Sequence, residues 1–263
     1  MRENSTVNKV GVILLFLALW ELAPLTGVVD PVFIPRFSGV MATILDLYQS
    51  GEFLRHTRIS LLRAFTGLAV AVVIGLPLGL LLGGWFPRIQ QAAEPLMELF
   101  AVANPVILAH IIIFFLGIGE AAKTFIIAWL CVWPITFSTI TGIRTVDASL
   151  LKAARSLGLG RWQLFRLVVL PSAAPAIFTG LRLSAGYAFI MLIAAEMMGA
   201  SSGLGWFVAQ SQESYHVLRI FAGATVITFL AVLTDFSLKL LQHRWTFWSS
   251  ESAGNVLEQG RGI

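Results

Sequence analysis

The sequence predicts an all-α membrane protein with about six membrane-spanning helices. Of its 263 residues, 57% are hydrophobic and only 12% are charged, whereas about a quarter of the residues of a soluble domain are charged. Six apolar stretches are each long enough to cross about 30 Å of hydrocarbon as a helix. These stretches cover residues 10–27, 62–84, 94–116, 121–143, 174–199 and 218–241. We therefore expect a single membrane domain over residues 1–263.

The first stretch resembles a signal peptide because Arg2 and Lys9 precede it. However, no small-x-small cleavage site follows, and Glu21 and Pro24 occupy the place where one would lie. We expect this stretch to be retained as the first span.

Basic residues between the spans predict the orientation. Ten Lys and Arg residues lie in the N-terminal tail, the loops after the second and fourth stretches, and the C-terminal tail: Arg2, Lys9, Arg88, Arg144, Lys152, Arg155, Arg161, Arg166, Arg244 and Arg261. Three lie in the alternate segments: Arg36, Arg55 and Arg58. The positive-inside rule then places both termini and the 144–173 loop in the cytoplasm.

Small residues within the stretches predict close helix packing. Gly75, Gly79 and Gly83 recur at intervals of four, which puts them on one helix face where another backbone can approach. Helix packing is the simpler interpretation, and a moving surface is the alternative. Cys131 lies within an apolar run, and as the only cysteine it predicts a packing residue rather than an intrachain disulfide.

The 144–173 loop predicts a docking helix. Asp147 suits the N-cap of a helix and complements its dipole. An apolar stripe at helical spacing follows: Leu150, Ala153, Ala154 and Leu157. The other side carries Ser149, Lys152, Arg155 and Ser156.

A second helix follows in the same loop. Gly158 and Gly160 permit a sharp reversal, after which Arg161 to Leu170 forms an amphipathic stretch that we expect Pro171 to end. The resulting helix-turn-helix is suited to a groove on a cytoplasmic partner.

At these residues the sequence resembles a known family. The run KAARSLG, nine further residues and VVLP resemble the EAA loop of binding-protein-dependent ABC permeases, with Lys152 in place of the name-giving acid. The matching positions are Ala153, Ala154, Gly158, Val168, Leu170 and Pro171. The resemblance implies a type I importer permease fold in which Leu150 to Leu164 inserts into an ATPase subunit. The implied coupling residues are Leu150, Lys152, Ala153, Ala154, Arg155, Leu157, Gly158, Arg161, Leu164 and Pro171.

Further stretches are similar to the nitrate, sulfonate and taurine branch of that family. They are PVFIPRFSGV from Pro31, LGIGEAAK from Leu116, TGLRLS from Thr179 and AAEMMGASSGLGWFV from Ala194. The branch has several prolines where AVANPVILAHI keeps only Pro105, with Asn104 and His110 in place of others. The resemblance implies an anionic solute such as a sulfonate, taurine or nitrate.

The resemblance also implies an assembly in a bacterial inner membrane. It comprises a second copy of this chain, two cytoplasmic ATPase subunits and an external solute-binding protein. ATP and magnesium are then bound by the ATPase, and this chain binds no cofactor and catalyses no reaction.

Polar residues inside the spans are candidates for the solute pathway, because an ionisable group in hydrocarbon must face protein or water. The candidates are Glu98, Asn104, His110, Arg182 and Glu196. His110 has a second interpretation, since its ring can pair with a backbone carbonyl. Asp235 and Lys239 are four residues apart, and we expect them to pair with each other.

Other functions stay open at this point. A self-sufficient channel or ion-coupled carrier would share the same spans. An intramembrane serine hydrolase would use Ser201 with His216 as base, although the strand-turn-helix of a nucleophile elbow is not expected here. The string Gly117 to Thr124 falls short of a P-loop, no metal-ligand spacing occurs, and the dispersed basic residues argue against nucleic-acid binding.

Overall fold

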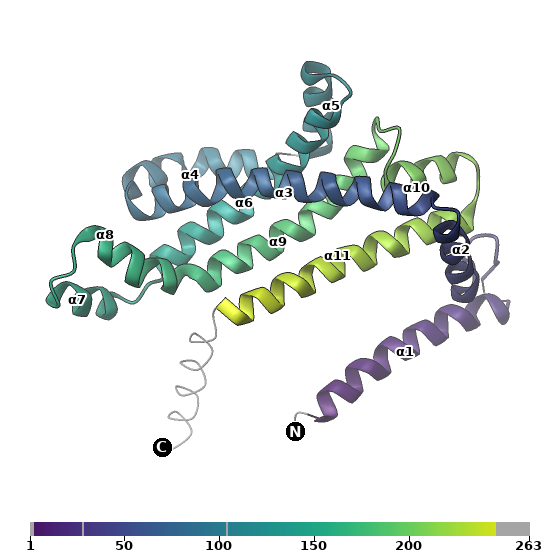
Figure 1. The fold of residues 1–263 in the computed structure, drawn as a ribbon, viewed down its shortest axis with the longest axis horizontal. Helices are drawn as coiled ribbons and strands as arrows, with labels where there is room; N and C mark the ends of the chain where they lie inside the picture. The colour runs from purple at the N-terminus through teal and green to yellow at the C-terminus, as the bar shows by residue number, and fades with distance from the viewer. Residues whose placement is uncertain (1–2, 28, 104, 246–263) are drawn as a thin grey trace. The chain divides into compact units, whose positions relative to one another are not determined.

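The computed structural model describes residues 3–27, 29–103 and 105–245, and every regular element in these ranges is a helix (Figure 1). Asn104, Arg2 and Arg261 lie outside the described residues. The chain forms two compact units, Met1–Leu61 with Glu196–Phe229 and Leu62–Ala195 with Leu230–Ile263. We call them unit 1 and unit 2. The all-α fold class is confirmed.

Unit 1 begins with α1 (Glu3–Leu25) and α2 (Phe37–Gln49). It also contains the first part of α3 (Glu52–Gly84), α10 (Leu204–Glu213) and the first part of α11 (Val217–Trp245). The Glu21 carboxylate accepts hydrogen bonds from the backbone amide and hydroxyl of Ser38, at 2.9 and 2.8 Å. This acid in the first apolar stretch therefore satisfies an amide in the first turn of α2.

Unit 2 contains the rest of α3 and the remaining helices. These are α4 (Pro87–Val102), α5 (Pro105–Leu116), α6 (Glu120–Arg144), α7 (Ala148–Ser156), α8 (Arg161–Leu164), the π-helix η1 (Phe165–Val169) and most of α9 (Leu170–Met197), followed by the rest of α11. The predicted third span, 94–116, is thus two helices rather than one. Pro105 lacks the amide that would continue α4.

A ladder of glycines holds α3 against α6. A Cβ added at Gly75 would lie 2.9 Å from the carbonyl oxygen of Val132, and one at Gly79 would lie 2.6 Å from the Cβ of Thr139. Gly83 continues the same contact one turn further along. The packing interpretation of these glycines is confirmed, because only a hydrogen atom fits between the two backbones.

The α6 and α9 helices are joined by a reciprocal pair of hydrogen bonds. The Cys131 thiol donates to the carbonyl oxygen of Ser184 at 3.2 Å, and the Ser184 hydroxyl donates to the carbonyl oxygen of Cys131 at 2.8 Å. Both residues are fully buried. Cys131 is therefore the packing residue that the sequence predicts.

Four described helices are long and apolar enough to cross a membrane: Glu52–Gly84, Glu120–Arg144, Arg161–Met197 and Val217–Trp245. The α4 and α5 helices count as a fifth if they form one broken span, and the first stretch forms a shorter apolar helix, Gly11–Leu25. That all six stretches cross the bilayer stays a prediction.

Candidate functional site

The predicted helix-turn-helix forms between α6 and α9. Asp147 caps α7, and its carboxylate accepts the Ser149 amide at 2.8 Å. This backbone hydrogen bond, with a second one from the Ser149 side chain, holds the pKa of Asp147 below its ordinary value. Gly158 then reverses the chain with a φ of +79°, and α8 begins at Arg161. We call residues 147–164 the hairpin.

The predicted apolar stripe of α7 is divided between two faces. Ala154 is 6% exposed and packs against the protein's own chain, whereas Leu150 is 51% and Leu157 82% exposed. Ala153 is exposed as well. Ala154 therefore anchors α7, and Leu150, Ala153 and Leu157 form the outward face.

The prediction that Pro171 ends the second helix is wrong. The helix continues from Arg161 to Met197, and Pro171 lies in the first turn of α9. The π-helix η1 comes immediately before it. A π-turn widens the helix where a proline would otherwise clash with a carbonyl of the preceding turn. The hairpin is consequently continuous with α9.

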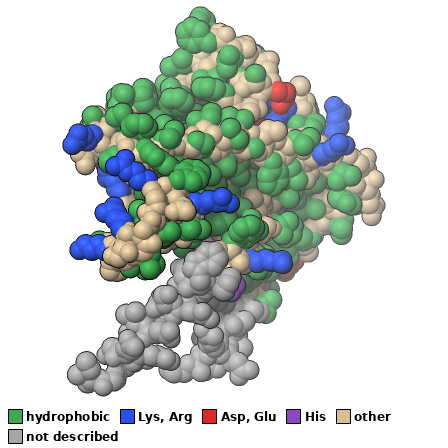
Figure 2. Space-filling view, turned by 60° about the vertical axis from the view of Figure 1, so that its left-hand side comes forward, with side chains coloured by type: hydrophobic (Ala, Val, Ile, Leu, Met, Phe, Trp, Pro, Cys, Tyr) green, Lys and Arg blue, Asp and Glu red, His purple; other side chains and the backbone are tan. Residues whose placement is uncertain are grey.

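A cavity of about 440 Å³ lies between the hairpin and the ends of α3 and α6. Trp85, Leu151 and Leu164 are among its apolar lining residues, and Arg155 and Arg161 line it as well. Neither arginine has an ion pair within the described part of the chain. Figure 2 shows basic side chains gathered beside hydrophobic surface on the side that carries α7 and α8.

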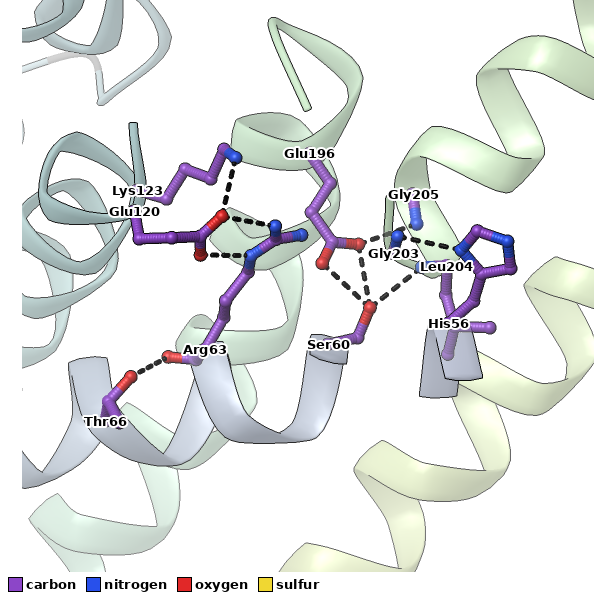
Figure 3. A network of polar contacts seen from close by, with 10 residues as sticks. All are labelled: His56, Ser60, Arg63, Thr66, Glu120, Lys123, Glu196, Gly203, Leu204 and Gly205. Atoms are coloured by element: carbon purple, nitrogen blue, oxygen red, sulfur yellow. Dashed lines mark hydrogen bonds and ion pairs between the residues drawn. The ribbon is translucent and has the colours of Figure 1, made fainter. Parts of the chain in front are cut away.

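Unit 1 contains a buried carboxylate at the N-terminus of α10 (Figure 3). Glu196 is 1% exposed and accepts hydrogen bonds from the Ser60 hydroxyl and the Gly205 amide, both at 2.8 Å. The Ser60 oxygen accepts the Leu204 amide at 2.8 Å, and the His56 Nδ1 atom accepts the Gly203 amide at 3.0 Å. These side chains thus satisfy the first amides of α10. The N-terminus of a helix also favours a negative charge beside it.

Unit 2 contains a separate cluster of charges (Figure 3). Arg63 of α3 pairs with Glu120 of α6 through two nitrogens, at 2.6 and 2.5 Å, and Lys123 lies 3.1 Å from the same carboxylate. The Arg63 and Lys123 side chains are 6% and 9% exposed, and that of Glu120 is 63% exposed. The cluster fastens the start of α6 to α3.

Comparison with known proteins identifies the family. The family model described as "Binding-protein-dependent transport system inner membrane component" matches residues 75–247, well over half of the chain. The chain belongs to this family of ABC importer permeases. Its members are transport components rather than enzymes. The family and the long apolar helices together identify the permease as a multi-pass protein of the inner membrane.

Two curated relatives align with nearly the whole permease. The taurine transport system permease protein TauC of Escherichia coli (strain K12) is 30% identical over 95% of this chain and 92% of that protein. The putative aliphatic sulfonates transport permease protein SsuC of Bacillus subtilis (strain 168) is 31% identical over 90% of this chain and 86% of that protein. The resemblance stated from the sequence is confirmed.

A solved structure shows the same fold. A chain of the MetNI methionine ABC transporter, in an inward-facing conformation, superimposes with a TM-score of 0.68 at 21% identity, covering 75% of this chain and 98% of that chain. The importer permease fold is therefore confirmed.

The predicted pathway residues have separate surroundings. Glu98 is exposed on α4, and the His110 Nδ1 atom lies 2.8 Å from the carbonyl oxygen of Val106, as its structural interpretation expects. Arg182 pairs with Asp235 of α11 at 3.0 Å. The expected pair of Asp235 with Lys239 is therefore wrong. Contact of these side chains with a solute stays a prediction.

Sequence reasoning missed the cluster of Arg63, Glu120 and Lys123. Arg63 and Lys123 lie only one and two residues inside the predicted stretches 62–84 and 121–143, and they are not among the polar residues that the sequence analysis singles out within the spans. Their position just inside two different spans, with an acid beside one of them, was the available signal.

The enzyme-like strings have other roles in the structure. Gly117 lies in a turn with a φ of +74°, and Glu120 and Lys123 lie in the first turn of α6. Ser201 precedes α10 in a non-helical segment, while His216 lies beyond that helix. No group of metal-ligating side chains occurs among the described residues.

Proposed function

We propose that the hairpin is the element through which a separate cytoplasmic ATPase drives this permease. One observation carries the proposal: a capped helix between two long apolar helices presents Leu150 and Leu157 outward instead of burying them. An amphipathic helix with an exposed apolar face is suited to a groove on a partner. The arginines at the cavity can orient that partner by charge.

The hairpin also has a path for transmitting movement. It is continuous with α9 through η1, and its cavity is bounded by the ends of α3 and α6. Displacement of α7 therefore acts on helices that are packed together through the glycine ladder. Closure of the ATPase would then rock these helices between outward-open and inward-open states.

The proposed assembly contains two copies of the permease, two ATPase subunits and an external solute-binding protein. Each permease chain forms a single membrane domain. Both termini and the hairpin face the cytoplasm, which the distribution of Lys and Arg supports. ATP and magnesium are bound by the ATPase.

The proposed solute is a small anion of the sulfonate, taurine or nitrate class. The names of relatives that align over most of the chain support this class. The external binding protein selects the solute, and the permease provides the pathway.

Co-purification of the ATPase with permease variants tests the proposal. Leu157→Asp places a charge on the outward face, and Arg155→Glu reverses a cavity charge. We expect both to lower the recovered ATPase by at least about tenfold, the effect of about 1.4 kcal/mol. Leu45→Asp is the matched control, because Leu45 is 61% exposed on α2, outside the hairpin.

Normal recovery of the ATPase with Leu157→Asp would contradict the proposal. Solute uptake by vesicles that contain the permease alone would instead support a channel or ion-coupled carrier.

A further inference from the structure

A stripe of aromatic side chains runs along α6. Phe125, Trp129, Trp133 and Phe137 recur at intervals of four, so they share one helix face. Neighbouring ring centroids lie 6.1, 5.6 and 6.4 Å apart. This face is distinct from the residues of α6 that meet the glycine ladder of α3.

Phe100 of α4 covers both tryptophans. Its ring meets Trp129 edge-on at 5.7 Å and stacks on Trp133 at 6.1 Å. Phe100 is itself 40% exposed. One half-exposed ring thus packs against both indoles.

Both indoles carry an unsatisfied donor. The Nε1 atoms of Trp129 and Trp133 are buried and have no hydrogen-bond partner among the described residues. An indole N–H only donates, and it normally finds an acceptor when buried. Two such groups, one turn apart, are a cost that the fold has not removed.

The helix break lies close to this site. The α4 helix ends at Val102, two residues beyond Phe100, and α5 begins at Pro105. A broken helix at membrane depth is tolerated where it is buried in protein or lines a water-filled cavity, and transporters use such breaks at substrate sites.

We infer that the indole N–H groups of Trp129 and Trp133 donate to the oxygens of a transported sulfonate when Phe100 moves aside. The inference rests on the proposed function, and it assigns the solute contacts to these two residues. A sulfonate presents several acceptor oxygens, and hydrogen bonds to an ionised acceptor are the stronger ones. Its alkyl part packs against the phenylalanine rings.

Neutral donors suit a site of passage. Conduction requires binding that is favourable enough for entry and weak enough for release. Two indole N–H groups attract an anion without the full charge of a lysine or arginine. A quaternary ammonium ion is the competing ligand, because aromatic faces attract cations.

The test uses the complete importer in proteoliposomes with saturating loaded binding protein. Uptake of labelled taurine, butanesulfonate and choline is measured for wild type, Trp129→Phe, Trp133→Phe and Trp245→Phe. Phenylalanine keeps an aromatic ring and removes the N–H group. Trp245 is the control, since it is 61% exposed at the end of α11.

We expect Trp129→Phe and Trp133→Phe each to lower the maximal uptake rate of both sulfonates about tenfold. This is the effect of losing one hydrogen bond to a charged group. Trp245→Phe should leave the rate unchanged. Equal uptake of the sulfonates by wild type, Trp129→Phe and Trp133→Phe overturns the inference and leaves the proposed function standing. Wild type that moves choline in place of the two sulfonates overturns the anion class itself.

Thermal unfolding supplies a second readout. Trp20 is the reference, because its Nε1 atom donates to the carbonyl oxygen of Pro35 at 3.1 Å. Trp20→Phe should lower Tm, whereas Trp129→Phe and Trp133→Phe should leave Tm equal or raise it, because they remove an unsatisfied group. If Trp129→Phe or Trp133→Phe lowers Tm as much as Trp20→Phe does, the inference is overturned in favour of a structural role. Loss of the permease dimer in either variant, seen by native mass spectrometry, overturns it in the same way.

Discussion

Gly79 and Gly186 offer the same substitution in two different surroundings. Both lie inside long helices, α3 and α9. A Cβ at Gly79 would lie 2.6 Å from the Cβ of Thr139 and 3.0 Å from the carbonyl oxygen of Thr136. A Cβ at Gly186 meets nothing within 4 Å. Neither atom near Gly79 can rotate away, because one is a backbone carbonyl oxygen and the other is a Cβ bonded directly to the backbone of its own residue.

The difference between the two alanine variants isolates the cost of separating α3 from α6. Replacing glycine by alanine inside a helix contributes up to about 1 kcal/mol of stability at either position. Overpacking at Gly79 costs about 1–3 kcal/mol, which offsets that gain. Gly79→Ala should therefore be less stable than Gly186→Ala by about 1–3 kcal/mol, or about 2–12 °C in Tm.

Thermal unfolding of the purified permease in the same detergent or nanodisc measures this difference. Both variants must first insert into the membrane at wild-type levels. If Gly79→Ala unfolds at the same temperature as Gly186→Ala, or above it, the close contact of α3 and α6 is not what holds unit 2 together.

Three further predictions concern the polar contacts. Asp147→Ala should destabilise α7, because it removes the N-cap hydrogen bond to the Ser149 amide. Since the pKa of Asp147 is lowered in the folded protein, its contribution to stability should be present above the ordinary carboxyl pKa and be lost as pH falls through the lowered value. Thermal unfolding should therefore show a difference between wild type and Asp147→Ala at neutral pH that disappears in acid. Gly203→Ala should lower Tm sharply, because its φ is +118° and a Cβ would collide with the Glu196 carboxylate; proteolysis near α10 should increase, and an unchanged digest would contradict this. Glu120→Gln should lower the free energy of unfolding by about 1–3 kcal/mol, and Tm with it, because the buried Arg63 loses its charged acceptor; a Tm equal to wild type would show that the charge of Glu120 contributes nothing to stability.

The four long apolar helices were predictable from the sequence because each needs only a long run of apolar residues, whereas the division of the third stretch into α4 and α5 was not predicted. The hairpin was predictable for a similar reason: Asp147 as a cap and Gly158 at a left-handed turn are local signals, and the structure places both as expected. Local chemistry is what a single sequence carries most directly.

Contacts between helices were less accessible. The pairing of Asp235 with Arg182 rather than Lys239 depends on how α9 and α11 pack, which outweighs the four-residue spacing within α11. Pro171 failed as a helix end because the π-turn before it accommodates the ring. Tertiary packing and local backbone adjustment decide such cases, and neither is visible in residue spacing.

The central claim is that the hairpin lies in the cytoplasm and is held by a separate ATPase. Leu157→Cys places a thiol at a position that is 82% exposed, and native Cys131 does not compete because it is fully buried. Labelling with a membrane-impermeant maleimide is then compared in right-side-out and inside-out vesicles, with and without the ATPase. We predict labelling in inside-out vesicles alone, with protection by bound ATPase. Labelling from the outer face, or labelling that the ATPase leaves unchanged, would contradict the account.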